Sequence, residues 1–190
     1  MVITYLGEGC FRFQSGETSL LLDPSGNRLK ADVTLKTAVD PGEVVSAPDV
    51  VSFAGEYEIK GIEIEGVEIS EESTPKLVKT AYKVMWDDIT IGILGGVGTA
   101  PDAKVLEKIG EPDILILPVE ENHFLEPEAA GGLTRQLEPA VVIPSLYSDK
   151  SVKAFAKEMG QPGETEERFT FKKKDLSPEA MKLVVLGAKT

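Results

Sequence analysis

The side chains that could carry acid–base, nucleophilic or metal chemistry are few in this sequence. The 190 residues include one histidine, His123, and one cysteine, Cys10. Zinc and iron hydrolases and most acid–base relays draw on several histidines. The single imidazole therefore restricts the chemistry open to this chain more than any other feature.

His123 lies in a short polar segment, Glu120–Phe124, between an apolar run and a helix-like stretch. In α/β folds, functional groups commonly follow the carboxyl end of a strand. One interpretation is a general base or metal ligand close to Glu120 and Glu121. The other is a loop histidine bonded to a carbonyl or a neighbouring carboxylate, and the lack of a second imidazole favours it.

Cys10 and the acidic residues have plainer interpretations. Cys10 belongs to an alternating stretch, Cys10–Phe13, with no histidine partner in sequence, so a small buried core residue is favoured over a nucleophile. A group of glutamates is interpreted as solvent-facing strand and loop charges, because no calcium-loop pattern is visible. These are Glu63, Glu65, Glu68, Glu71 and Glu72.

The glycines of Gly95-Gly96-Val97-Gly98 follow a strand-like run and precede a helix-like one. Such a setting can cradle a phosphate on backbone amides. The pattern ends on Pro101 instead of glycine or alanine. We also expect the preceding strand to pair antiparallel with residues 77–86, not to start a βαβ unit. A tight glycine-rich connection is therefore favoured over a nucleotide site.

Composition excludes several classes of function. Twenty basic and 32 acidic residues give a net charge of −12, which argues against binding nucleic acid or an anionic membrane through bulk charge. A single cysteine excludes an intramolecular disulfide and points to a reducing cytoplasm. The start of the chain lacks the features of a signal peptide, and the longest apolar runs, such as Ile114–Pro118, are too short to span a bilayer.

The elements that must position these residues change in character halfway along the chain. The first half is predicted to form strands at 2–6, 10–13, 19–23, 31–35, 49–53, 62–69, 77–86 and 89–94. The first three of these strands are expected to form an antiparallel meander. The second half predicts helices at 102–109, 126–137 and 149–159, alternating with strands at 113–118, 140–144, 169–171 and 183–186. Lys172–Lys174 is expected on a solvated hairpin edge. Strand–helix alternation implies parallel strands, so the prediction is an α/β fold in one domain, 1–190.

Six segments, taken in order, carry a family pattern. They read ITYLGEGCF (3–11), LLLDP (20–24), GEYE followed by GI (55–62), DILILPV (113–119), PEAA (127–130) and LEPAVVIP (137–144). This succession resembles the metallo-β-lactamase-fold hydrolases of the ascorbate-phosphate-lactonase branch. The resemblance implies a four-layer αββα sandwich. It also implies two metal ions that activate a water for attack on a phosphoester or lactone.

The sequence departs from that family at its metal ligands. Glu8 stands where the family has its opening histidine, and Lys36–Asp40 stands where an H-x-H-x-D-H segment is expected. Gly96 replaces the bridging aspartate and Leu146 replaces a histidine. His123 matches a loop position that is not a ligand in the family. The expected remnant is a vestigial cleft formed by Glu8, Asp23, Asp40, Gly96, His123 and Leu146.

The preferred hypothesis is a catalytically degenerate member of that family that acts as a cytoplasmic binding or scaffold protein without a metal. Its small-molecule ligand is not identified, and self-association is left open. The alternative is a metal-dependent phosphodiesterase or lactonase with a reduced site around Asp23, Glu8 and His123, in which oxygen ligands hold a divalent cation weakly. A third idea is that a facing partner chain supplies the missing ligands.

Overall fold

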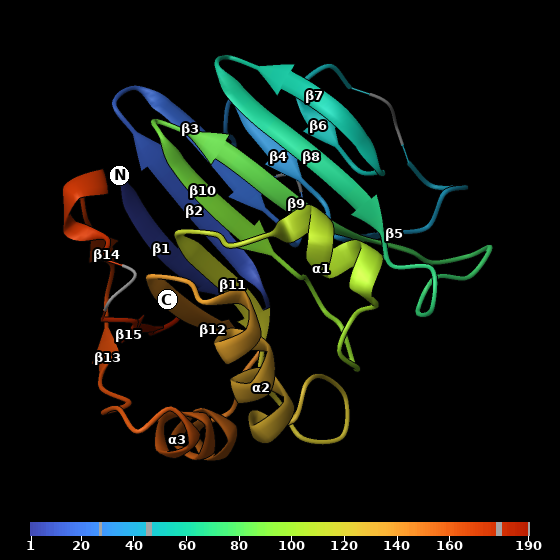
Figure 1. Cartoon of the computed structure of the whole chain (residues 1–190). Helices are drawn as coiled ribbons and strands as arrows, with labels where there is room; N and C mark the ends of the chain where they lie inside the picture. The colour runs from blue at the N-terminus through green and yellow to red at the C-terminus, as the bar shows by residue number, and fades with distance from the viewer. Residues whose placement is uncertain (27, 45–46, 178–179, 190) are drawn as a thin grey trace.

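Two β-sheets face each other, and three α-helices cover the outer side of one of them (Figure 1). The computed structural model describes residues 1–26, 28–44, 47–177 and 180–189. No helix in these ranges combines the length and the apolar character needed to cross a membrane.

The first sheet begins with the predicted antiparallel meander β1 (Val2–Gly7), β2 (Cys10–Ser15) and β3 (Thr18–Leu22). β4 (Val33–Leu35) and β6 (Val50–Val51) extend it in parallel. β14 (Phe169–Thr170) closes the other edge by pairing with Val2 and Ile3 of β1. The order is β14-β1-β2-β3-β4-β6.

The second sheet has the order β15-β12-β11-β10-β9-β8-β7, and β5 (Ala38–Val39) also pairs with β9. Its antiparallel half is β7 (Gly55–Ile59), β8 (Ile62–Glu68), β9 (Val78–Trp86) and β10 (Ile89–Ile93). Its parallel half continues through β11 (Ile114–Pro118), β12 (Val141–Ser145) and β15 (Lys182–Leu183). Every residue of β11 and β12 is buried, as expected for strands covered on both faces.

The helices are α1 (Ala103–Ile109), α2 (Pro127–Leu137) and α3 (Asp149–Glu158). α1 starts where Asp102 accepts the Val105 N–H at 2.9 Å, and α2 carries Pro127 in its first turn, so both begin as predicted. Their apolar faces and the outer face of the second sheet form one buried cluster, which includes Leu133 and Phe155. A second cluster, which includes Phe11, Tyr82 and Ile143, fills the space between the sheets.

The predicted α/β sandwich is therefore confirmed. Among the described residues, however, no α-helix covers the outer face of the six-stranded sheet. One of the two helical layers of the expected four-layer αββα sandwich is therefore reduced.

Three details of the sequence prediction were wrong. β10 is antiparallel to β9 but parallel to β11, with α1 between them, so it does start a βαβ unit. The closing strand 183–186 is two short strands, because the chain leaves β12 after Leu183 and β16 (Val185–Leu186) pairs with β13 (Thr165–Glu166). Lys173–Asp175 forms a 3₁₀ helix in place of a hairpin edge, and Lys173 pairs with Asp113.

Candidate strand-end cleft

A cleft of about 400 Å³ opens where the ends of several strands meet. Its walls come from the β1–β2 turn, from the segments after β3, β4, β10 and β12, from β9 and from the loop after β11. We call it the strand-end cleft. It is lined by Glu8, Gly9, Asp23, Pro24, Lys36, Thr37, Ala38, Lys79, Gly96, Phe124 and Leu146.

Three non-glycine residues in the cleft have left-handed backbone conformations. The φ angles are 52° at Glu8, 43° at Asp23 and 50° at Leu146. This region is uncommon for residues with a Cβ, and least favourable for a bulky one such as leucine. Strained backbone tends to gather at functional sites, because the surrounding fold must hold it in place. Three of the eight such residues in the described part of the chain line this one cleft.

Asp23 is held at the end of β3 by Thr37. The Thr37 N–H donates to one carboxylate oxygen at 2.7 Å, and the Thr37 hydroxyl donates to the other at 2.5 Å. Burial raises the pKa of Asp23 above its ordinary value, although the bonds from Thr37 and the nearby Lys36 act in the opposite direction. Both oxygens thus already accept a hydrogen bond within the chain.

Replacing Asp23 with asparagine should stabilise the protein at high pH. A group whose pKa is raised by folding contributes stability below its unfolded pKa and loses that contribution as the pH rises through the folded value. An asparagine can keep both contacts with Thr37, tolerates a left-handed backbone and never ionises. We expect Asp23→Asn to melt about 2 °C or more above the wild type near pH 8, and the difference to shrink near pH 4. Thermal melting by circular dichroism measures this.

The control is Asp49→Asn, a change at an exposed position. It should leave the melting temperature nearly unchanged at both pH values. A lower melting temperature for Asp23→Asn near pH 8, or a difference that does not depend on pH, would contradict the interpretation.

The charged centre of the cleft is a lysine on β9. The Lys79 ammonium donates to the Gly96 carbonyl at 2.8 Å and forms an ion pair with Glu72 at 2.7 Å. The side chains of Lys79 and Glu72 are only 19% and 15% exposed, so the pair is largely withdrawn from water. A fixed positive charge therefore lies directly beside Gly96.

Glu72 also holds the glycine-rich loop after β10. Its carboxylate accepts the N–H groups of Gly98 and Thr99 at 2.8 to 3.0 Å, and the Thr99 hydroxyl at 3.0 Å. Burial raises the pKa of Glu72, but the bonds from Lys79, Gly98 and Thr99 outweigh it and lower the pKa below its ordinary value. The interpretation of Glu72 as a solvent-facing charge was therefore wrong. The amides that could have cradled a phosphate bind this carboxylate instead.

Apolar side chains fill the space beside Gly96. A Cβ added at Gly96 would lie 3.2 Å from the Phe124 ring and 3.6 Å from Leu146. Leu146 also packs against Gly9, where an added Cβ would lie 3.2 Å from the leucine side chain. An aspartate at position 96 would require Phe124 to move. Phe124 and Leu146 therefore occupy the volume that a larger polar side chain would need.

The structure brings together four of the six residues expected in the cleft: Glu8, Asp23, Gly96 and Leu146. Asp40 does not line it, because β5 leads the chain away and the Asp40 carboxylate accepts the Gly42 N–H in a turn. His123 is exposed and also lies outside, while the next residue, Phe124, turns inward.

Cys10 is buried in the core, as predicted. Burial, with a smaller contribution from Asp23, raises the pKa of the thiol to about 11. The reactive thiolate is therefore scarce at neutral pH.

Sequence reasoning did not single out Lys79, Thr37 or Phe124, and it placed Glu72 on the surface. No local signal distinguishes Lys79, because β9 also contains a second lysine, Lys83. The backbone amides that bond Glu72 lie 26 and 27 residues away in the chain, so no pattern in sequence connects them to it.

The fold and the position of the cleft can now be compared with those of known protein families. Residues 2–145 match the family described as the beta-lactamase superfamily domain. Because that match covers most of the chain, the protein belongs to the metallo-β-lactamase superfamily.

Relatives with similar sequences or structures agree with this assignment. A metal-dependent hydrolase of Methanopyrus kandleri is 24% identical, over 77% of this chain and 84% of its own. A Thermotoga maritima protein assigned to the Zn-dependent hydrolases of the superfamily has a TM-score of 0.79 at 24% identity, covering 98% of both chains. A metallo hydrolase of Ignicoccus hospitalis has a TM-score of 0.64 at 17% identity, covering 90% of this chain and 99% of its own. These structural likenesses concern the fold.

The donor set of the cleft does not fit the pair of metal ions that the fold family implies. A tightly bound Zn²⁺ takes about four nitrogen, sulfur or carboxylate ligands. Gly96 and Leu146 have no donor side chain, and the oxygens of Asp23 already bond to Thr37. Among the described residues, no group of three or more histidine, cysteine, aspartate or glutamate side chains is arranged to hold a metal ion.

Proposed function

We propose that this chain is a member of the metallo-β-lactamase superfamily that has lost the dinuclear metal centre and acts as a cytoplasmic binding or scaffold protein through the strand-end cleft. The observation that carries the proposal is the position of Lys79. Its ammonium is bonded to the carbonyl of Gly96, the residue that the family resemblance aligns with the bridging aspartate.

Electrostatics supports this proposal. A divalent cation beside Gly96 would be repelled by a lysine that is itself fixed by Glu72. Glu72 is engaged by four donor groups and Asp23 by two, so Glu8 is the one carboxylate of the cleft lining that is left to compensate, and a tightly bound ion needs about four ligands. The lysine supplies the positive charge that joins the loops of the cleft.

The test is the metal content of protein purified without chelator. We expect fewer than about 0.1 ions of zinc, manganese or iron per chain by elemental analysis, because a structural or catalytic site is normally filled stoichiometrically. We also expect no turnover of a phosphodiester or a simple lactone above the buffer rate. The Thermotoga maritima relative, prepared in the same way, controls for loss of metal during purification.

The competing function is a metal-dependent hydrolase, the activity for which the Methanopyrus kandleri relative is named. About one or two metal ions per chain, together with metal-dependent turnover, would overturn the proposal. Metal and activity that appear only in an oligomeric fraction would also overturn it, in favour of a site completed by a partner chain.

A further inference from the structure

A second cavity, of about 530 Å³, lies at the outer edge of the six-stranded sheet. It exists because β14 pairs with β1 only at Val2 and Ile3, and the preceding residues turn away to pair with β16. The gap is closed by two backbone bonds, from the Gly187 N–H to the Glu166 carbonyl and from the Lys189 N–H to the Tyr5 carbonyl. The cavity shares no lining residue with the strand-end cleft.

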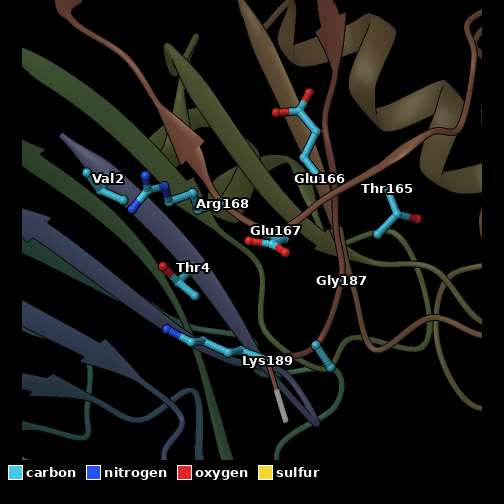
Figure 2. Close-up of a pocket in the computed structure, with 9 residues that line it drawn as sticks. Val2, Thr4, Thr165, Glu166, Glu167, Arg168, Gly187 and Lys189 are labelled. Atoms are coloured by element: carbon cyan, nitrogen blue, oxygen red, sulfur yellow. The ribbon is translucent and has the colours of Figure 1, made fainter.

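Two cations and a hydroxyl gather on one side of this cavity. Figure 2 shows the Thr4 hydroxyl between the Arg168 guanidinium and the Lys189 ammonium, with the Glu167 carboxylate near the middle. Arg168 comes from the segment before β14, Thr4 from β1 and Lys189 from the segment after β16. Three separate segments of the chain therefore contribute to one polar wall.

These cations are not used by the fold. Among the described residues the ion pairs involve seven other basic side chains, and neither Arg168 nor Lys189 is among them. Of the glutamates at the cavity, Glu166 pairs with Lys182. In a chain with a net charge of −12, these two cations line a single cavity, and the described residues place no carboxylate in an ion pair with either.

We propose that this cavity binds a small compound through a carboxylate or phosphate group held by Arg168, Lys189 and Thr4. The planar guanidinium fork of Arg168 matches two oxygens of such a group, the lysine adds charge and the threonine adds a donor. The volume is in the range of small-molecule sites. Glu167 favours a ligand whose other end carries a hydrogen-bond donor, such as a hydroxyl or an ammonium.

The test uses the ¹⁵N-labelled full chain titrated with inorganic phosphate, succinate or serine, with sodium chloride as the control for ionic strength. We expect saturable shifts of the amides near Thr4, Arg168 and Lys189 with at least one probe, at a dissociation constant on the order of millimolar. Phosphate and succinate distinguish the two kinds of oxyanion. If serine binds more tightly than the other probes and Glu167→Gln removes this preference, Glu167 contacts the hydrogen-bond donor at the other end of the ligand.

Variants decide whether the cavity is responsible. Arg168→Gln should weaken binding about tenfold and Lys189→Gln less, since a bidentate contact is lost only in the first. The matched control, Lys153→Gln, removes an exposed lysine on α3 and should bind as the wild type does. These changes are on the surface, so the variants should fold. Unchanged binding in Arg168→Gln, or no saturable shift with any probe up to about 20 mM, would overturn the proposal.

Discussion

Lys79→Met should lower the free energy of unfolding by about 3 kcal/mol, or about 9 °C in melting temperature at neutral pH. The substitution keeps a long side chain but leaves the Glu72 carboxylate without its counter-ion and the Gly96 carbonyl without its donor. Removing one partner of a largely buried ion pair costs more than the pair itself contributes, because the other charge stays desolvated. Thermal and urea unfolding measure the effect.

Two comparisons make this prediction specific. The double variant Lys79→Met/Glu72→Gln should recover part of the loss, because no uncompensated charge remains. Lys153→Met, at an exposed position, should change stability by no more than about 0.5 kcal/mol. If Lys79→Met melted within a degree of the wild type, Lys79 would not be the cation that holds the cleft together.

The same ion pair predicts a loss of stability in acid. The pKa of Glu72 is lowered in the folded protein, so its contribution is present above the unfolded pKa and is lost as the pH falls through the folded value. The gap between wild type and Lys79→Met should therefore be largest near neutral pH and narrow in acid, where only the loss of the Gly96 contact remains. A gap of the same size at both pH values would mean that the methionine does not act through the charge of Glu72.

Gly95→Ala should be destabilising to a similar degree, about 3 kcal/mol. Gly95 has a φ of 64°, and a Cβ added there would lie 2.5 Å from the Cβ of Thr37. The alanine would adopt an unfavourable backbone conformation and displace the residue that bonds Asp23. Urea unfolding measures the loss, and the amide signal of Thr37 should move as well.

Gly132 provides the matched control, because an added Cβ there meets nothing within 4 Å and the residue lies inside α2. Gly132→Ala should stabilise the protein by about 0.5 to 1 kcal/mol, through better helix propensity. Equal effects of the two substitutions would show that the contact between Gly95 and Thr37 does not constrain the cleft.

Most of the fold could be predicted because its signals are local. The alternating residues of β2, the apolar runs of β11 and β12, and caps such as Asp102 each report on a few neighbouring positions. The error at β10 has a different origin. A strand with one antiparallel and one parallel neighbour has no distinctive pattern, so the βαβ unit could not be recognised from its sequence.

The cleft was predictable only in part. Glu8, Asp23, Gly96 and Leu146 could be located because each occupies a position marked by the family resemblance. Lys79 and Glu72 could not, since the bonds that define them join β9 and the β8–β9 connection to the loop after β10. A charged side chain in a strand or loop usually faces water, and only the three-dimensional contacts show which ones do not.

The left-handed turns at Glu8, Asp23 and Leu146 have a consequence for how new recognition could arise in this scaffold. Each turn aims its side chain at a common space because of the path of the main chain, whatever residue occupies the position. Substitutions at Glu8 and Leu146 would change which ligands the strand-end cleft accepts, whereas Asp23 is also bonded to Thr37. Asparagine at position 146 would relieve conformational strain at the cost of the packing of Leu146 against Gly9.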